Sequence, residues 1–350
     1  MNRSGKLALV TALVSLLAVA LVACGDDSNG GDSGEASGDE QVKLGAFILA
    51  SANTYSQQNL KGVEEAATEL GNVEVTSFDG AFDGSKQATQ IQDAVASGEY
   101  DAFVVFPNDG AVVAPAVEEA TEAGIDTVAA YAPIGTDIEN AEPQVEGVVA
   151  TVWHPNVPNG TNLGDLTVEA CEEEHADSDP CQVLYITASK EIAFENAKQQ
   201  EVEKVLGEAS SPIEVVSVKE GEFLVDPSRT ATEDALQATP DIDVVVTSGD
   251  QMTMGAEQAL GDANVKGVSL VGNGGAAEAV KLVDQGRWFG TPVYLPIDEG
   301  RVSGEIAIEA ARGTEPDETA VDIVAMSPVG PNYTSEDKGS GFTPQWAINQ

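Results

Sequence analysis

The chain has 350 residues, with 59 acidic residues against 16 Lys and Arg, so its formal net charge at pH 7 is −43. Such a charge repels nucleic acid and anionic lipid head groups and excludes both as binding partners. A solvated acidic surface explains the charge more simply than a specific cation site does.

The N-terminus has the order of an export signal. Arg3 and Lys6 precede a long apolar run, which ends in the sequence LVAC at residues 21–24. A small residue before a cysteine resembles the lipobox of bacterial lipoproteins, which implies that residues 1–23 are a signal peptide and that Cys24 is lipidated. A transmembrane anchor is the alternative. Both interpretations place the remaining chain on the extracytoplasmic face of the cell membrane, attached through this segment.

Residues 24–41 are rich in Gly, Ser and acidic residues and are too polar to bury a core, so they predict a flexible acidic tether. Their Asp and Asn residues do not have the spacing of a calcium loop. From Val42 onward the chain is longer than one hydrophobic core usually holds, which favours two lobes.

Short apolar runs alternate with segments of helical periodicity in the first half of the chain, as in a parallel sheet with helical crossovers. In the segment 56–70, for example, Leu60, Val63, Ala67 and Leu70 recur at helical spacing. The predicted strands are 42–49, 73–79, 102–107 and 126–132, and the predicted helices are 56–70, 85–98 and 111–124.

The same alternation starts again after Val148 and predicts a second α/β lobe, although no residue-level repeat accompanies it. The predicted strands are 148–153, 181–188, 213–218, 243–249, 268–274 and 289–295, and the predicted helices are 163–175, 194–208, 231–240, 254–263 and 275–286.

Cys171 and Cys181 are left as a pair once Cys24 is assigned to the lipid. In an oxidising compartment they predict a disulfide that closes a short loop. A metal pair is the alternative, but His154 and His175 do not complete the spacing of a zinc site.

No catalytic motif stands out in the chain. The segment GAFDGSK at residues 80–86 differs by one residue from a phosphate-binding loop, and the turn GNGG at residues 272–275 lacks the spacing of a dinucleotide-binding loop. Close carboxylate pairs are expected by chance in so acidic a chain. We therefore expect no enzyme, no cofactor and no metal site, and an enzyme is the alternative class, which no motif supports.

Residues 42–327 resemble the periplasmic sugar-binding proteins of the ribose/galactose type, which deliver ligands to ABC importers. The resemblance is carried by the order and spacing of four segments, 43–71, 91–125, 239–260 and 268–286. It implies an α/β fold of type I, with two Rossmann-like lobes that contain parallel sheets and a hinge of three segments.

The resemblance also implies the lobe limits. Residues 42–152 with 295–325 would form the N-terminal lobe, and residues 153–294 with 326–350 the C-terminal lobe. The three crossing segments would lie near residues 153–156, 294–296 and 324–328. Ligands of open α/β sheets bind at the carboxyl ends of the strands, which places the ligand between the lobes.

Candidate ligand-binding residues follow from the loops that contact ligands in this family. Tyr55 lies where the family has a stacking ring, and Asn53 is either a polar contact or a turn residue. The complete predicted set is Asn53, Tyr55, Phe106, Asn108, Tyr131, Trp153, Phe194, Asn196, Asp250, Asn273 and Tyr294, of whose rings about half are expected to be core.

Several positions depart from the family pattern, because groups that grip sugar hydroxyls are replaced. Tyr131 and Ala132 stand where the family has an Asp-Arg pair, and Asn196 stands near the position of an arginine. An asparagine is replaced by Gly249 before Asp250, an aspartate by Gly274 and a glutamine by Tyr294. Buried polar groups without partners cost about 1 to 3 kcal/mol each, so ribose, glucose and galactose fit poorly.

The resulting hypothesis is an extracytoplasmic solute-binding lipoprotein of an ABC importer, a monomer that captures a sugar, a polyol or a sugar-like compound and contacts the membrane permease. A less polar aromatic or alicyclic ligand is the alternative ligand class. Signalling to a membrane sensor is the alternative role. A transcriptional repressor with the same lobes is disfavoured by the export signal and by the acidic charge.

Overall fold

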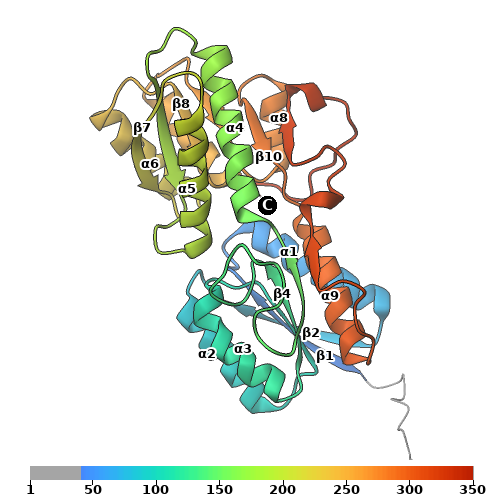
Figure 1. Cartoon of the computed structure of the whole chain (residues 1–350). Coiled ribbons are helices and arrows are strands. Elements are labelled where there is room, and N and C mark those ends of the chain that lie inside the picture. Colours follow the sequence, from blue (N-terminus) through green and yellow to red (C-terminus); the bar gives the residue numbers. More distant parts are fainter. Residues whose placement is uncertain (1–40, 350) are drawn as a thin grey trace, which may run out of the picture. The chain divides into compact units, whose positions relative to one another are not determined.

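The computed structural model describes residues 41–349 of the chain (Figure 1). The predicted signal peptide, Cys24 and the tether up to residue 40 lie outside the described residues. None of the helices between residues 41 and 349 combines the length and the hydropathy that a membrane span requires.

The first sheet has the strand order β11-β5-β4-β3-β1-β2, and all its neighbouring strands are parallel. The predicted strands of the first half are confirmed. The strand at residues 148–153, which the sequence grouped with the second set, instead joins this sheet, as does a short strand from the C-terminal part of the chain. The bounds are β1 Val42–Ile48, β2 Val73–Asp79, β3 Ala102–Val105, β4 Asp126–Tyr131, β5 Val148–Trp153 and β11 Ala320–Asp322.

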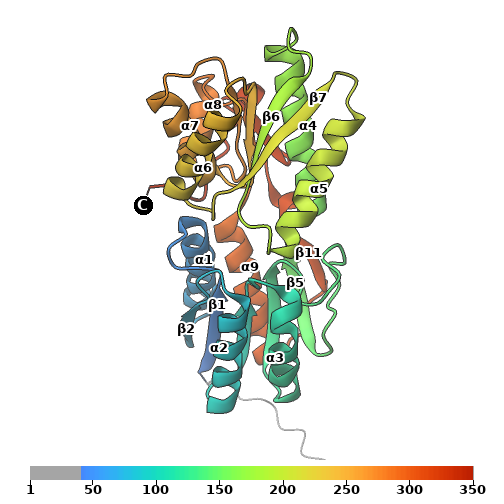
Figure 2. The same cartoon turned by 90° about the vertical axis from the view of Figure 1, so that its left-hand side faces the viewer.

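Helices cover both faces of this sheet because side chains alternate along each strand. Leu44 and Ala46 belong to the core on the side of α1 and α9, whereas Phe47 and Phe103 belong to the core on the side of α2 and α3 (Figures 1 and 2). The bounds are α1 Thr54–Leu70, α2 Gly84–Ser97, α3 Gly110–Glu122 and α9 Pro296–Ala311.

The second sheet has the strand order β12-β10-β9-β8-β6-β7, in which only the pair β10–β12 is antiparallel. The bounds are β6 Cys181–Thr187, β7 Ile213–Glu220, β8 Val244–Thr247, β9 Ser269–Val271, β10 Gly290–Pro292 and β12 Asn332–Thr334. The sequence did not predict β11 or β12, since three residues are too few to show a period.

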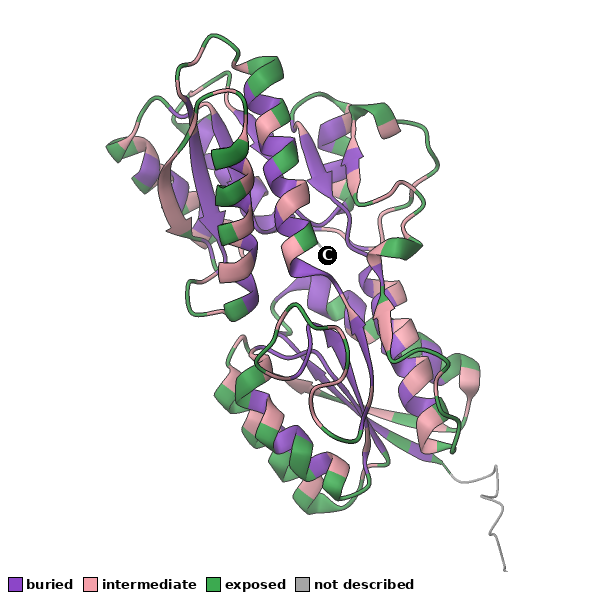
Figure 3. Cartoon of the chain, viewed as in Figure 1, coloured by how far each residue is buried: buried purple, intermediate pink, exposed green. Residues whose placement is uncertain are grey.

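The helices around the second sheet are α4 Asn156–Glu174, α5 Ala193–Glu208, α6 Val225–Ala238, α7 Asp250–Asp262 and α8 Ala277–Asp284. Figure 3 shows the central strands of both sheets buried and the outer faces of the helices exposed, whereas the edge strands β2 and β7 are only partly buried. Within the described residues, two single-turn helices, η1 Val324–Met326 and η2 Ser335–Asp337, complete the secondary structure.

The chain passes from one sheet to the other three times among the described residues. It does so between β5 and α4, between β10 and α9, and between β11 and β12. The predicted limit after residue 152 lies one residue before the end of β5, and the other two predicted limits lie within these passages.

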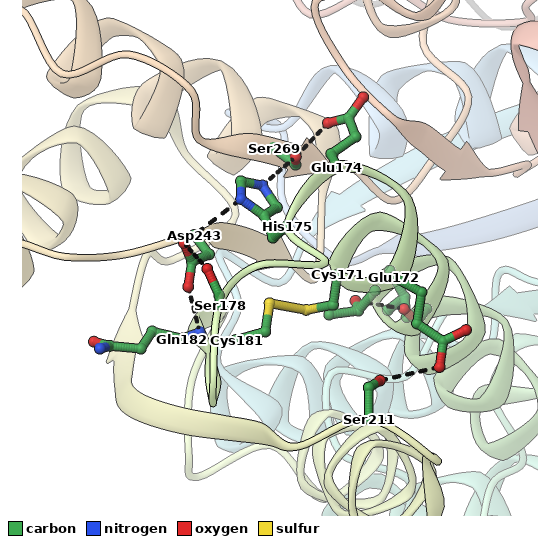
Figure 4. Close-up of a disulfide and its surroundings, with 12 residues drawn as sticks. Cys171, Glu172, Glu174, His175, Ser178, Cys181, Gln182, Ser211, Asp243 and Ser269 are labelled. Atoms are coloured by element: carbon green, nitrogen blue, oxygen red, sulfur yellow. Dashed lines mark hydrogen bonds and ion pairs between the residues drawn. A yellow bond between two sulfur atoms is a disulfide. The ribbon is translucent and has the colours of Figure 1, made fainter.

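A disulfide joins the helix α4 to the strand β6, as the sequence predicts for Cys171 and Cys181 (Figure 4). The residues between them form a tight loop whose polar groups converge on Asp243. This carboxylate accepts hydrogen bonds from Ser178 Oγ at 3.0 Å and from the backbone N–H of Gln182 at 2.8 Å. The bridge lies at the amino end of β6, opposite the end at which a ligand is expected.

Candidate ligand-binding site

The loops that end the strands of both sheets enclose one small cavity. Its free volume is about 40 Å³, measured by the positions that the centre of a water-sized sphere can occupy. One water needs roughly 10 to 15 Å³ on this measure, so the cavity holds only a few atoms in this closed arrangement. It is lined by Leu49, Asn53, Tyr55, Phe82, Tyr131, Phe194, Phe223, Ser248, Gly249, Gln251, Asn273, Tyr294 and Trp346.

The cavity wall consists mainly of aromatic rings that meet edge to face. The ring of Tyr55 lies 6.1 Å from that of Tyr131, 5.5 Å from that of Tyr294 and 5.8 Å from that of Trp346. Tyr131 also meets Phe194 at 5.2 Å. Such edge contacts hold the rings in fixed orientations and leave hydroxyl and amide groups as the polar part of the wall.

Two amide side chains connect the lobes across the cavity. Asn53 Oδ1 accepts from the backbone N–H of Ser56 and so caps α1, while Asn53 Nδ2 donates to Gln251 Oε1 at 2.9 Å. Gln251 Nε2 in turn donates to Thr54 Oγ1 at 3.0 Å. Asn53 thus caps α1 and also lines the cavity, and its contact with a ligand stays a prediction.

A second amide pair orients the opposite wall. Asn159 Nδ2 donates to Asn273 Oδ1 at 3.1 Å, and the hydroxyl of Tyr294 donates to Asn159 Oδ1 at 3.2 Å. Asn273 Nδ2 also donates to the carbonyl of Ser248 at 3.3 Å. The pair holds Asn273 and Tyr294 at the cavity by bonds made within the protein.

Behind Tyr55, a buried carboxyl group serves as its hydrogen-bond acceptor. Glu299 Oε2 accepts from the Tyr55 hydroxyl at 2.8 Å and from Asn59 Nδ2 at 2.7 Å. Burial raises the pKa of Glu299 to about 8, although both hydrogen bonds act to lower it. Burial and the neighbouring Glu299 also raise the pKa of Tyr55, so Tyr55 remains a neutral donor.

A buried ion pair supports the wall on the other side. Lys198 Nζ lies 2.6 Å from Glu195 Oε1, and both side chains are fully buried. Burial acts to lower the pKa of Lys198, but the charge of Glu195, the neighbouring Tyr294 and Tyr185 and the hydrogen bond to Glu195 together raise it. Lys198 lies over the ring of Phe194, 5.9 Å from its centre, and so connects the ion pair to the cavity wall.

His154, in the passage between β5 and α4, packs against the same rings without lining the cavity. Its ring lies 3.9 Å from that of Tyr294 and stacks on Tyr131 at 6.1 Å. Burial, and then the charge of Lys198, lower the pKa of His154 to about 3. The imidazole is therefore neutral at pH 7.

The turn GNGG at residues 272–275 surrounds a carboxylate of the protein itself. Asp250 accepts from the backbone N–H of Asn273 at 2.8 Å, from that of Ala276 at 2.7 Å and from Thr291 Oγ1 at 2.8 Å. Burial raises the pKa of Asp250 to about 7, whereas these hydrogen bonds act to lower it. The polar groups of the turn are thus occupied internally.

The backbone angle and the close neighbours of Gly274 explain why the turn has a glycine at this position. Its φ is +143°, and a Cβ atom there would lie 2.5 Å from Cζ2 of Trp346 and 3.1 Å from Oδ2 of Asp250. Trp346 Nε1 donates to the Gly274 carbonyl at 2.7 Å. The family pattern has an aspartate at this position. In this chain the glycine has no side chain, so the indole of Trp346 packs directly against its backbone.

Six of the predicted ligand-binding residues line the cavity, and they come from both lobes. They are Asn53, Tyr55, Tyr131, Phe194, Asn273 and Tyr294. Their role in ligand binding stays a prediction.

Five predicted residues do not line the cavity, for reasons of packing. Phe106 is fully buried in the core, and Trp153 ends the strand β5. Asn108 donates to the carbonyl of Leu49, Asn196 donates to that of Lys190, and Asp250 holds the glycine turn. Four of them lie at or just after the end of a strand and Asn196 lies in the helix α5, but the sequence could not show which way each side chain turns.

Seven lining residues were not in the predicted set: Leu49, Phe82, Phe223, Ser248, Gly249, Gln251 and Trp346. Trp346 had one signal, since it is a large ring in a tail otherwise rich in Gly, Ser and Pro. Phe82 and Phe223 each follow a strand and a glycine by a few residues, a pattern that also occurs in ordinary turns.

A wider hollow lies outside the cavity, between loops that follow β2, β3, β6 and β7. We call it the outer groove; its free volume is about 580 Å³ on the same measure. The cavity lining contains no Asp, Glu, Lys, Arg or His. Within the described residues, no three His, Cys, Asp or Glu side chains are grouped as metal ligands would be.

Comparison with known proteins gives one consistent result. A family model, described as a periplasmic binding protein domain, matches residues 45–315. The ribose import binding protein of Bacillus subtilis (strain 168) is 24% identical over 283 residues, which cover 80% of this chain and 85% of that protein. The xylitol-binding protein of Mycolicibacterium smegmatis is 24% identical over 294 residues, covering 83% of this chain and 76% of that protein.

Solved structures share the fold. An ABC transporter solute-binding protein from Mycobacterium smegmatis with bound glycerol has a TM-score of 0.73 and 23% identity, covering 88% of this chain and 99% of that one. A solute-binding protein from Actinobacillus succinogenes with bound D-allose has a TM-score of 0.71 and 19% identity, covering 86% and 100%. The chain belongs to the periplasmic binding protein family of the ribose/galactose type.

Proposed function

We propose that this protein is an extracytoplasmic solute-binding protein of an ABC importer, which captures a small neutral polyol or sugar-like molecule between its two lobes. The observation that carries the proposal is the enclosed cavity, whose wall comes from both lobes and offers rings, amides and hydroxyls but no charged side chain. A wall of this kind suits a neutral ligand with several hydroxyl groups.

The ligand class follows from the two kinds of surface in the cavity. Faces of aromatic rings pack against the C–H groups of a polyol, and Asn53, Gln251 and Asn273 offer amide donors and acceptors. Because the free volume is small, either the ligand is compact or the lobes close less tightly around it than they do in this structure. Xylitol and glycerol, which the names of two similar proteins include, belong to this class.

A less polar ligand remains the second candidate because Leu49, Phe82, Phe194 and Phe223 contribute apolar surface to the same wall. An alicyclic or aromatic compound would bury this surface and leave the amide pairs bonded to each other.

Capture requires the lobes to move, because the cavity is enclosed. The three passages between the sheets are the hinge of our proposal, and a ligand that contacts both lobes selects the closed state. Closure would present a surface to the permease, with the lipid on Cys24 holding the protein near the membrane. The same movement would serve a membrane sensor.

We propose binding without turnover. The cavity offers neither a nucleophile beside a base nor a carboxylate that faces the ligand space. The carboxyl group of Glu299 lies behind Tyr55 and is already bonded to it. Recovery of an unchanged ligand after prolonged incubation tests this part of the proposal.

Thermal unfolding of the protein with a ligand panel tests the proposal, since a ligand that binds only the folded state raises the melting temperature. The panel contains glycerol, xylitol, D-ribose, D-allose and myo-inositol, with cyclohexanol for the less polar class. We expect xylitol or a related polyol to raise the melting temperature, and Asn273→Ala to abolish the shift. Asn140→Ala, at an exposed asparagine outside the cavity, is the control. If no polyol in the panel raises the melting temperature, the proposed ligand class is contradicted.

A further inference from the structure

Two loops of the same geometry lie at equivalent places in the two lobes. One follows β2 and contains Ala81 and Phe82, with φ of +54° and +57°; the other follows β7 and contains Glu222 and Phe223, with φ of +56° and +54°. In the first loop the backbone N–H of Asp83 donates to the carbonyl of Gly80 at 3.0 Å, and Leu224 and Gly221 form the corresponding bond at 3.0 Å. Both loops are turns of type I′.

A phenylalanine at positive φ is uncommon, because its Cβ atom crowds the backbone. Turns of this type usually contain Gly, Asn or Asp at the two central positions. Both loops of this chain instead place a large ring at the second central position. Strained residues persist where the surrounding structure holds them, and they gather at sites with a function.

The two rings meet across the space between the lobes. Their centres are 5.7 Å apart and their planes are inclined by 32°. Asn53 Nδ2 lies 3.4 Å from the carbonyl of Phe223 and donates to it, which ties the second loop to the start of α1. The contact thus joins the first lobe to the second beside the Asn53–Gln251 bond.

Phe82 and Phe223 line both the cavity and the outer groove. No other residue of the described chain lines both spaces. The other residues that line the cavity are all buried, so the two half-buried rings stand between the cavity and the outer groove. Both side chains are only half-buried, although each also packs against the hydrophobic core.

We propose that Phe82 and Phe223 form a two-ring gate, which closes the cavity toward the outer groove and must separate for a ligand to enter or leave. The identity of the molecule that passes through the gate rests on the proposed function. The gate itself does not depend on any ligand, because it consists of the contact between the two rings. The type I′ turns aim the rings at each other, and the ring contact adds to the stability of the closed state.

Trp346 provides a probe of the gate that needs no ligand. Its indole N–H lies at the cavity wall and donates to the Gly274 carbonyl. The chain has three tryptophans, so their indole N–H signals can be resolved by NMR after ¹⁵N-tryptophan labelling and assigned with Trp346→Phe. Hydrogen–deuterium exchange of the Trp346 signal then reports how often water reaches the cavity.

In the double variant Phe82→Ala/Phe223→Ala, we expect the Trp346 indole N–H to exchange about tenfold faster than in the unaltered chain, as loss of an aromatic pair implies. The double variant Phe82→Leu/Phe223→Leu, which keeps apolar bulk, should restore most of the protection. Trp288, buried in the core, is the internal reference, and its exchange should stay unchanged. Val112→Ala, at an exposed residue of the outer groove, is the matched control.

Equal Trp346 exchange in the unaltered and double-alanine chains would overturn the gate, and so would an equal acceleration of Trp288, which indicates general loosening of the fold. Failure of every ligand in the panel would leave this result untouched and would instead contradict the proposed function. The two failures are therefore distinguishable.

Discussion

Asn53 Nδ2 donates to Gln251 Oε1 at 2.9 Å, and this bond joins the start of α1 in one lobe to the start of α7 in the other. Both amides lie at the cavity, where a ligand would contact them. The same groups therefore link the two lobes and would also meet the ligand.

Replacing Gln251 should open the ligand-free protein. Gln251→Leu keeps the size of the side chain but removes its bonds to Asn53 and Thr54, each worth about 0.5 to 1.5 kcal/mol. We expect a larger radius of gyration by small-angle X-ray scattering, because the closed state loses population. Gln285→Leu, at an exposed glutamine, should scatter like the unaltered chain. Identical curves for all three proteins would show that these bonds do not control closure.

Glu299 should make stability fall as the pH rises. Its folded pKa of about 8 lies above the usual 4.5, so between these values the folded protein holds a proton that the unfolded chain has lost. The stabilisation is complete below pH 4.5 and is lost as the pH rises through 8. Asp250, with a pKa of about 7, acts in the same direction.

Glu299→Gln should remove part of this pH dependence. Between pH 5 and pH 9, the unfolding free energy of the unaltered chain should fall by at least about 1.4 kcal/mol more than that of the variant, the value of one pKa unit. Denaturant titrations at several pH values measure the difference. Glu305→Gln, on the same helix α9 but partly exposed, should keep the slope of the unaltered chain. Parallel slopes for the unaltered chain and Glu299→Gln would refute the assignment.

Removing one member of the buried ion pair should destabilise the protein strongly. Lys198→Met leaves Glu195 buried without its partner, which typically costs about 3 to 5 kcal/mol. Adding Glu195→Gln should recover part of that loss, and urea unfolding of the four proteins in the cycle gives the coupling.

The same helix offers a matched control for this experiment. Lys204 and Glu201 have the same spacing and a distance of 2.9 Å, but Lys204 is exposed. Lys204→Met should therefore have little measurable effect. A similar loss at both sites would mean that burial of the pair is not the cause.

The disulfide should stabilise the protein without affecting the cavity. It closes a loop with a sequence separation of 10, for which chain entropy predicts about 2 to 3 kcal/mol. The variant Cys171→Ala/Cys181→Ala should unfold at lower urea, whereas the exchange rate of the Trp346 indole N–H should stay the same. Faster Trp346 exchange would connect the loop to the cavity, contrary to their positions at opposite ends of the sheet.

A side chain at position 274 should displace Trp346. Gly274→Ala adds a Cβ atom 2.5 Å from the indole, and overpacking of this kind costs about 1 to 3 kcal/mol. Gly313→Ala is the control, because Gly313 has a φ of +85° with open space around it and so reports the backbone cost alone. Thermal unfolding compares the two, and a larger loss at Gly313 would argue against the crowding.

The sequence by itself determined the alternation of strands and helices, the pairing of the two cysteines and the edge of the sheets at which the cavity lies. Periodicity carries this information because a strand such as 102–107 buries every residue, while a helix such as 56–70 repeats its apolar face. The sequence did not predict the short strands β11 and β12, since they form only where a neighbouring strand is already in place.

Only the tertiary structure decided which rings face the cavity. Phe106 follows directly on β3 and turns into the core, whereas Phe82 reaches the cavity because a turn at positive φ redirects it. Trp346 reaches it because the C-terminal segment returns to the bare backbone of Gly274. Local periodicity sets the direction of side chains within a strand or helix, but beyond the ends of strands the direction depends on contacts with residues far away in the chain.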